Sequence, residues 1–290
     1  MNKFWVHAAL FTVALLYGGN YSIAKFAMPE YINPFGFIAI RVLVSTILFW
    51  IIHHFISDEK IISKSDYIRL FFSGLFGVAI NQIMFFKGLS LTTPINASII
   101  MTISPVVVVV GAYLAGNERL SLRKIIGLLV GATGAYLLIT KDGAEFSNQN
   151  FVGNLFIFIN ACSYATYLII VKKLLLKYQS FTVIKWVFLF GGIMAIPFGI
   201  PNLMAIDWLS LPMVAWSSIL YVIIGVTFLA YLLNSWGLKF VNSSVVSIYI
   251  YLQPAIATTI AILLKSDTFE VNYLFYALLI MSSVYLVSKK

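Results

Sequence analysis

Charged residues are scarce in this sequence, and their scarcity is the first constraint on its fold. Only 10% of the 290 residues are Asp, Glu, Lys or Arg, whereas 61% are hydrophobic. Soluble domains carry roughly 25% charged residues, so a soluble chain of this length could not keep so much apolar surface away from water. The composition therefore indicates an integral membrane protein and argues against a soluble enzyme.

Paired cysteines, metal-binding clusters and catalytic motifs are also missing. The single Cys162 excludes an internal disulfide, and the sequence has no HExxH, GxSxG or P-loop motif. His53-His54 near Asp58 is the one candidate for membrane-embedded transferase chemistry, and it is too small a set for a metal. The net charge of +9 forms no clustered basic patch. We therefore expect no catalytic residue, no metal, no cofactor and no nucleic-acid partner.

Long apolar runs fill the sequence instead. A helix needs about 20 apolar residues to cross a bilayer, and the runs lack the period-two alternation of barrel strands. The expected fold is an all-α integral membrane protein with ten transmembrane helices. These are, approximately, residues 4–26, 35–56, 67–89, 95–115, 124–140, 153–171, 181–200, 214–238, 244–264 and 271–287.

Basic residues are distributed unevenly between the loops of this ten-span arrangement. With the N-terminus in the cytoplasm, fourteen of the 19 Lys and Arg residues lie on the cytoplasmic side, and Arg41 lies within a span. The other side carries only Lys25, Lys87, Lys141 and Lys265. Cytoplasmic loops of membrane proteins are enriched in Lys and Arg. We therefore predict a multi-pass protein of the bacterial inner membrane with both termini in the cytoplasm.

An internal repeat relates the two halves of the chain. A shift of 149 residues, without a gap, places Gly88-Leu89 on Gly237-Leu238 and Pro105 on Pro254. The same shift places Glu118 on Asp267, and the first spans align more weakly, with Lys25 opposite Lys172. Five spans are an odd number, so the second half must enter the membrane from the opposite side. We predict one membrane domain built of two inverted five-helix repeats, residues 1–142 and 150–290.

The aligned prolines lie inside apolar runs. Proline removes a backbone donor and clashes with the preceding turn, so it bends or breaks a helix. Matched broken helices in two repeats point to the binding site of a secondary transporter, and we predict that Pro105 and Pro254 act as hinges. The alternative is that the two kinks only shape the bundle, because membrane helices tolerate proline.

The sequence also resembles a known family. The stretches YGGNYSIAKFAM from Tyr17, FGFIAIRVLVSTILFW in the second span and GLSLTTPINASIIMTISPVVVVVGAYLAGNE from Gly88 are similar to the EamA-like ten-helix transporters of the drug/metabolite transporter superfamily. The resemblance covers nearly the whole chain and implies an exporter or permease of amino acids and other small metabolites. Tyr17 and Tyr164 stand where this family more often has Trp, so the substrate does not follow from the resemblance.

Polar side chains recur on one face of several spans. Such residues are costly in lipid and are expected to point into the bundle, where amides and aromatic rings would suit an amphipathic metabolite. Interhelical hydrogen bonding is the alternative role for each of them. The candidate substrate-binding residues are Tyr17, Asn20, Asn81, Gln82, Ser98, Met101, Tyr164, Tyr167, Tyr231, Asn234, Tyr251 and Gln253; Phe85 and Asn160 share these faces.

Ionisable residues inside the spans are few. Arg41 lies about six residues into the second span, where it could attract an anionic group or extend its guanidinium to the lipid headgroups. All ten acidic residues fall in loops or at span ends. Proton-driven pumps commonly place carboxylates at membrane depth, so we expect no carboxylate-mediated proton coupling.

Together these features predict a secondary transporter that moves small organic metabolites such as amino acids by alternating access. A channel or facilitative pore is the main alternative, and a membrane-embedded transferase a weaker one. The expected partners are a small-molecule metabolite and the lipid bilayer, with the chain acting as a monomer or a weak homodimer.

Overall fold

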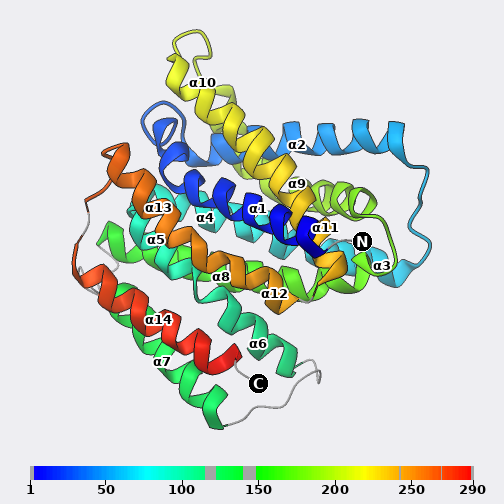
Figure 1. Ribbon diagram of the computed structural model, residues 1–290. Coiled ribbons are helices and arrows are strands. Elements are labelled where there is room, and N and C mark those ends of the chain that lie inside the picture. Colours follow the sequence, from blue (N-terminus) through cyan, green and yellow to red (C-terminus); the bar gives the residue numbers. More distant parts are fainter. Residues whose placement is uncertain (1–2, 115–121, 140–147, 242, 269, 289–290) are drawn as a thin grey trace.

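The computed structural model describes residues 3–114, 122–139, 148–241, 243–268 and 270–288, and every regular element in these ranges is helical. Figure 1 shows the helices packed side by side in one bundle. The predicted boundary between the two repeats, residues 143–149, falls mostly within residues 140–147, which with Glu118 lie outside the described residues.

The helices follow one another with short connections. In chain order they are α1 (Lys3–Ile23), α2 (Pro34–Ile56), α3 (Lys64–Gly74), α4 (Ile80–Leu91), α5 (Pro94–Met101), α6 (Ser104–Leu114), α7 (Leu122–Ile139), α8 (Gln149–Leu175), α9 (Ser180–Met204), α10 (Met213–Leu220), α11 (Ala230–Phe240), α12 (Ser243–Ile248), α13 (Leu252–Leu263) and α14 (Asn272–Ser288). Two 3₁₀ turns, η1 (Ala24–Phe26) and η4 (Tyr249–Tyr251), and two π-helical segments, η2 (Leu75–Ala79) and η3 (Tyr221–Leu229), join some of them.

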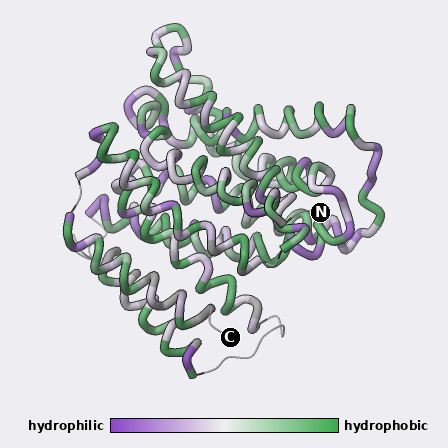
Figure 2. Tube along the Cα trace, in the orientation of Figure 1, coloured by the Kyte–Doolittle hydropathy of each residue, from purple (hydrophilic) through white to green (hydrophobic). Residues whose placement is uncertain are grey.

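Within the described residues, seven helical stretches are long and apolar enough to cross a membrane. They are Pro34–Ile56, Lys64–Leu91, Pro94–Gly111, Gln149–Leu175, Ser180–Met204, Met213–Phe240 and Val245–Leu263. Large apolar side chains such as Phe55 (80% exposed) and Leu263 (75% exposed) face outward, as a lipid-facing surface requires. Hydrophobic stretches run along the helices and hydrophilic ones gather at several connections (Figure 2). The chain is therefore an all-α, multi-pass membrane protein, and the count of ten spans stays a prediction.

Both predicted proline positions lie just after a break in a helix. α5 ends at Met101 and α6 begins at Ser104, and the Thr102 N–H caps the end of α5 by donating to the Ile99 carbonyl at 3.0 Å. In the second half, η4 separates α12 from α13, which carries Pro254 as its third residue. Proline is tolerated in the first turn of a helix, where its missing N–H would have no partner in any case. Each proline therefore begins a new helical segment.

The π-helical segments lie in the middle of long helices. α3, η2 and α4 form one continuous stretch, and α10, η3 and α11 form another. A π segment widens the turn and often occurs at functional sites. The Tyr231 hydroxyl, from α11, donates to the Gly77 carbonyl in η2 at 2.7 Å. The start of α11, directly after η3, thus meets η2 inside the bundle.

Close helix contacts depend on glycine at a few positions. A Cβ atom on Gly153 in α8 would lie 2.9 Å from the Gly88 carbonyl oxygen in α4, and one on Gly74 would lie 2.8 Å from the Gly191 nitrogen in α9. Small residues let helix backbones approach closely in membranes. These contacts hold α4 and α3 against the second half of the chain, and so bring their polar faces to the centre.

Candidate functional site

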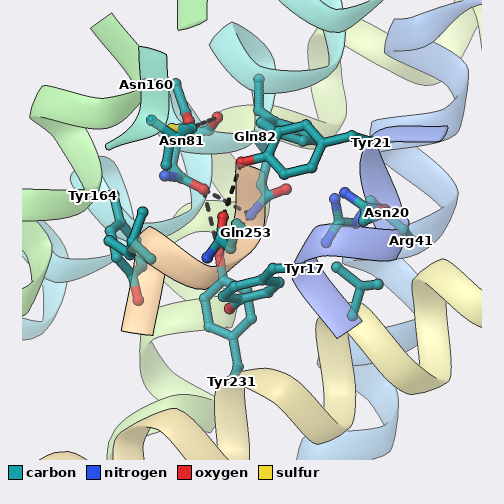
Figure 3. A pocket seen from close by; sticks show the side chains of 14 residues that line it. Tyr17, Asn20, Tyr21, Arg41, Asn81, Gln82, Asn160, Tyr164, Tyr231 and Gln253 are labelled. Carbon is teal, nitrogen blue, oxygen red and sulfur yellow. Dashed lines mark hydrogen bonds between the residues drawn. The ribbon is translucent and has the colours of Figure 1, made fainter. Parts of the chain in front are cut away.

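A pocket of about 490 Å³, including its opening to solvent, lies where the polar helix faces converge. Figure 3 shows its aromatic rings and amides pointing toward one another from several helices. Its fourteen lining residues are Tyr17, Asn20, Tyr21, Arg41, Asn81, Gln82, Phe85, Met101, Asn160, Tyr164, Val226, Tyr231, Ile250 and Gln253. Apolar and aromatic walls with a few convergent polar groups are typical of small-molecule sites.

A hydrogen-bond network organises the wall formed by α4 and α11. Gln82 Nε2 donates to the Tyr231 hydroxyl at 2.5 Å and to Asn81 Oδ1 at 3.0 Å. Across the pocket, the Tyr21 hydroxyl donates to Gln253 Oε1 at 2.9 Å and so ties α1 to α13. Polar groups are costly both in lipid and in an apolar interior without partners. These faces therefore turn inward, where they bond to one another.

A smaller cavity of about 210 Å³ adjoins the pocket toward the beginning of α1. The two share Tyr17, Tyr164, Ile250 and Gln253. The smaller one also contacts Leu10 and Asn234, whose Nδ2 donates to the Tyr164 hydroxyl at 2.6 Å. The two cavities thus lie along the length of α1.

Most of the residues selected from the sequence lie at these cavities. Eight line the main pocket, namely Tyr17, Asn20, Asn81, Gln82, Met101, Tyr164, Tyr231 and Gln253, and Asn234 lines the smaller cavity. Ser98, Tyr167 and Tyr251 line neither cavity. Ser98 is fully buried and donates to the Ile95 carbonyl of its own helix. Tyr167 packs its ring on Gly77.

Three lining residues, Tyr21, Val226 and Ile250, were absent from the candidate set. Tyr21 follows Tyr17 by four residues, which places it on the same helix face, so the spacing could have identified it. Val226 and Ile250 are apolar and carry no such signal. They reach the pocket from the π segment η3 and the 3₁₀ turn η4, whose backbone geometry the sequence does not reveal.

Arg41 lies inside the bundle, because its side chain is only 2% exposed. Its Nε and Nη2 atoms donate to Thr227 Oγ1 at 2.9 and 2.5 Å, and its Cζ atom lies 4.4 Å from the centre of the Phe86 ring. The alternative in which the guanidinium extends to the lipid headgroups is therefore wrong. Instead, Arg41 forms part of the pocket wall.

Two lysines bind the carboxyl ends of helices. Lys25 Nζ donates to the carbonyl of Thr92, the residue that ends α4, at 2.7 Å. Lys172 Nζ donates to the carbonyl of Val241, the residue that ends α11, at 2.7 Å, and also to that of Leu238. Cations at this end of a helix are stabilised by the unpaired carbonyls and the helix dipole. Lys25, in η1 directly after α1, and Lys172, in α8, thus each fasten the first part of their half to the end of another helix.

The histidines near the end of α2 make structural contacts. His53 Nδ1 lies 2.9 Å from Lys185 Nζ, and His53 Nε2 lies 3.1 Å from Thr182 Oγ1. No group of three or more His, Cys, Asp or Glu side chains among the described residues is placed to hold a metal ion.

A multi-pass helical bundle around a pocket of amides and tyrosines is an architecture found among membrane transporters. The sequence profile of the EamA-like transporter family matches residues 4–140 and again residues 151–289. The two matches cover most of the chain, and the chain belongs to this family.

Individual relatives agree with this assignment. The chain is 25% identical over 287 residues to an uncharacterized transporter of Archaeoglobus fulgidus, covering 98% of this chain and 97% of the relative. It is 22% identical over 265 residues to the uncharacterized transporter YyaM of Bacillus subtilis, covering 88% and 85%. A solved crystal structure superposes with a TM-score of 0.68 over 99% of this chain and 97% of its own, at 16% identity. That likeness shows the shared fold.

The family and the relatives together identify the chain as a membrane transporter and not an enzyme. The transferase alternative is thereby set aside. The substrate, the transport cycle and the roles of individual pocket residues stay open to proposal.

Proposed function

We propose that the chain is a secondary transporter that moves small organic metabolites such as amino acids by alternating access. The observation that supports this most directly is the central pocket, where eight residues chosen as substrate-binding candidates converge from both halves of the chain. Aromatic faces can bury the apolar part of a metabolite, while amides fix its polar groups. We therefore propose that the residues lining this pocket contact the substrate.

The ten-span arrangement is part of the same proposal. Besides the seven apolar stretches, α1, α7 and α14 contain 21, 18 and 17 residues. These lengths approach the roughly 20 residues that a membrane-spanning helix needs. Adding the three helices to the seven stretches produces the ten spans expected from the sequence.

Matched features in the two halves support an inverted repeat. Gln82 and Tyr231 are 149 residues apart, the period of the sequence repeat, and they bond to each other at the centre. The same period relates the helix ends Thr92 and Val241, each bound by a lysine of its own half. The profile matches to residues 4–140 and 151–289 support repeats close to 1–142 and 150–290.

The directions of the helices favour inversion of the second half. In Figure 1, α1 runs from right to left, whereas α8, the first helix of the second half, runs from left to right. α14, the last helix, also runs from left to right, opposite to α1. This supports both termini on one side, which the distribution of Lys and Arg places in the cytoplasm. Because one of its relatives is bacterial, we propose that the protein lies in a bacterial inner membrane.

A two-step experiment tests this function. Cells with and without the chain would first be exposed to a panel of amino acids and organic acids, and the compound whose toxicity changes would be radiolabelled. Purified protein in liposomes should then exchange the labelled compound against unlabelled compound inside. Gln82→Ala should reduce exchange, whereas Ser98→Ala, in a side chain that bonds only within its own helix, should not. Continuous ion currents without exchange would instead identify a channel.

A further inference from the structure

Arg41 brings a positive charge into the pocket that no other described lining residue neutralises. None of the residues that line either cavity is Asp or Glu. Among the described residues, the ion pair between Lys177 and Asp66, at 3.1 Å, lies elsewhere in the molecule. A guanidinium stays protonated in proteins, and an uncompensated charge at membrane depth is costly. The occupant of the pocket is the remaining source of negative charge.

The contacts of Arg41 leave part of its guanidinium free for a ligand. Both of its hydrogen bonds go to the single oxygen Thr227 Oγ1. The Thr227 hydroxyl proton is already donated to the Val222 carbonyl at 2.6 Å, so Thr227 acts purely as an acceptor for Arg41. The Nη1 atom has no hydrogen-bond partner among the residues that the structure describes. Thr227 and the Phe86 ring therefore fix the guanidinium while its free edge can bind a carboxylate in the two-pronged geometry typical of arginine.

Two buried amides in the pocket have unused acceptors. Asn20 is 3% exposed and Asn160 is 1% exposed, and the Oδ1 atom of each has no hydrogen-bond partner. Figure 3 shows Asn20 and Arg41 on one side of the pocket, with Asn160 and Tyr164 on the other. Buried acceptors without a donor are rare in folded proteins. The missing donor fits a hydroxyl group carried by the same ligand.

We infer that the pocket binds a small aromatic hydroxycarboxylate, whose carboxylate pairs with Arg41 and whose hydroxyl donates to Asn20 or Asn160. This inference rests on the proposed transport function and refines its substrate class. A zwitterionic amino acid would leave the pocket with the net positive charge of Arg41, whereas a hydroxy acid of the same shape neutralises it. The rings of Tyr17, Tyr164 and Tyr231 supply apolar faces for the aromatic body.

A matched ligand series tests the charge requirement. Purified protein in nanodiscs would be titrated with 3-phenyllactate, 3-phenylpropionate, phenylalanine and 2-phenylethylamine, which share one ring and differ in charge and hydroxyl. We expect 3-phenyllactate to bind most tightly, 3-phenylpropionate more weakly, phenylalanine more weakly still, and the amine not at all. Tighter binding of phenylalanine than of 3-phenyllactate, or no saturable binding of 3-phenyllactate at millimolar concentration, would overturn the inference.

Substitutions test the residues that are inferred to bind the hydroxycarboxylate. Arg41→Gln should weaken 3-phenyllactate by about tenfold or more, and Arg41→Lys should recover part of the loss because it keeps the charge. Because Arg41→Gln also removes a packed side chain, Asn20→Asp is the second variant: it keeps the shape, adds a negative charge and should weaken 3-phenyllactate relative to the amine. Unchanged affinity for 3-phenyllactate in both Arg41→Gln and Asn20→Asp would refute the assignment.

These experiments can refute the proposed transport function and the proposed anion site independently of each other. Binding of 3-phenyllactate that depends on Arg41, without any exchange in liposomes, would support the anion site and contradict the proposed transport. Exchange of an amino acid that is unaffected by Arg41→Gln would support transport and contradict the anion site.

Discussion

Gly77 tests the packing of the π segment beneath the pocket. A Cβ atom at this position would lie 2.8 Å from both Cε2 and Cγ of the Tyr167 ring, and nearer still to Cδ2. Carbon atoms in contact prefer about 3.5–4.0 Å, so Gly77→Ala must push the ring or the helix by roughly 1 Å. Tyr167 is only 1% exposed, and its ring lies beside those of Tyr164 and Tyr231, at centroid distances of 6.3 and 6.4 Å.

The expected loss of stability follows from these distances. Overpacking of a well-filled core typically costs about 1–3 kcal/mol. Alanine in place of glycine recovers up to about 1 kcal/mol of helix propensity. We expect Gly77→Ala to destabilise the protein by about 1–2 kcal/mol, measured as a fall in the thermal unfolding midpoint of the purified protein.

A matched control lies in the π segment of the other half. A Cβ atom on Gly225, in η3, would lie 3.2 Å from Leu16 Cδ2, the terminal methyl of a flexible side chain. Gly225→Ala should therefore leave stability unchanged or raise it by up to about 1 kcal/mol. The double variant Gly77→Ala with Tyr167→Leu should be more stable than the two single effects predict, by about 1 kcal/mol. An unchanged midpoint for Gly77→Ala, or strictly additive effects, would refute the reasoning.

Three further predictions concern other contacts. Asp66 is 2% exposed and accepts from Lys177 Nζ and the Tyr178 hydroxyl at 3.1 and 2.9 Å, so Asp66→Asn should lower stability by about 1–3 kcal/mol. Lys177→Met should cost less than about 1 kcal/mol because Lys177 is 58% exposed; thermal midpoints in the reverse order would contradict this. Tyr21→Phe removes one bond between α1 and α13 and should cost about 0.6 kcal/mol, the average for such bonds in membranes, with a larger effect pointing to a wider network. A thiol introduced by Met101→Cys in a Cys162→Ser background would report access to the pocket. Lys25→Met and Lys172→Met should each expose this thiol to impermeant reagents, but from opposite sides of the membrane. Exposure from the same side in both would argue against alternating access.

Much of the candidate site could be predicted from sequence because polar residues are rare within apolar helices. Tyr17 and Asn20 in one span, and Asn81 and Gln82 in another, stood out against their neighbours and line the pocket. Ser98 stood out equally but bonds to the Ile95 carbonyl of its own helix. A serine that faces a pocket and one that bonds back to its helix have the same local sequence signal, so sequence could not separate them.

The sequence by itself determined the membrane class and predicted the approximate spans and the repeat, because these depend only on apolar length and on order along the chain. The setting of Arg41 was decided by tertiary structure. Thr227, its bonding partner, lies 186 residues away, and the helices that line the pocket bring no acidic side chain to it. In a chain whose helices are apolar toward both lipid and core, hydrophobicity does not reveal how each helix is rotated. Only the packed bundle therefore shows which polar groups meet and which charge is left for a ligand.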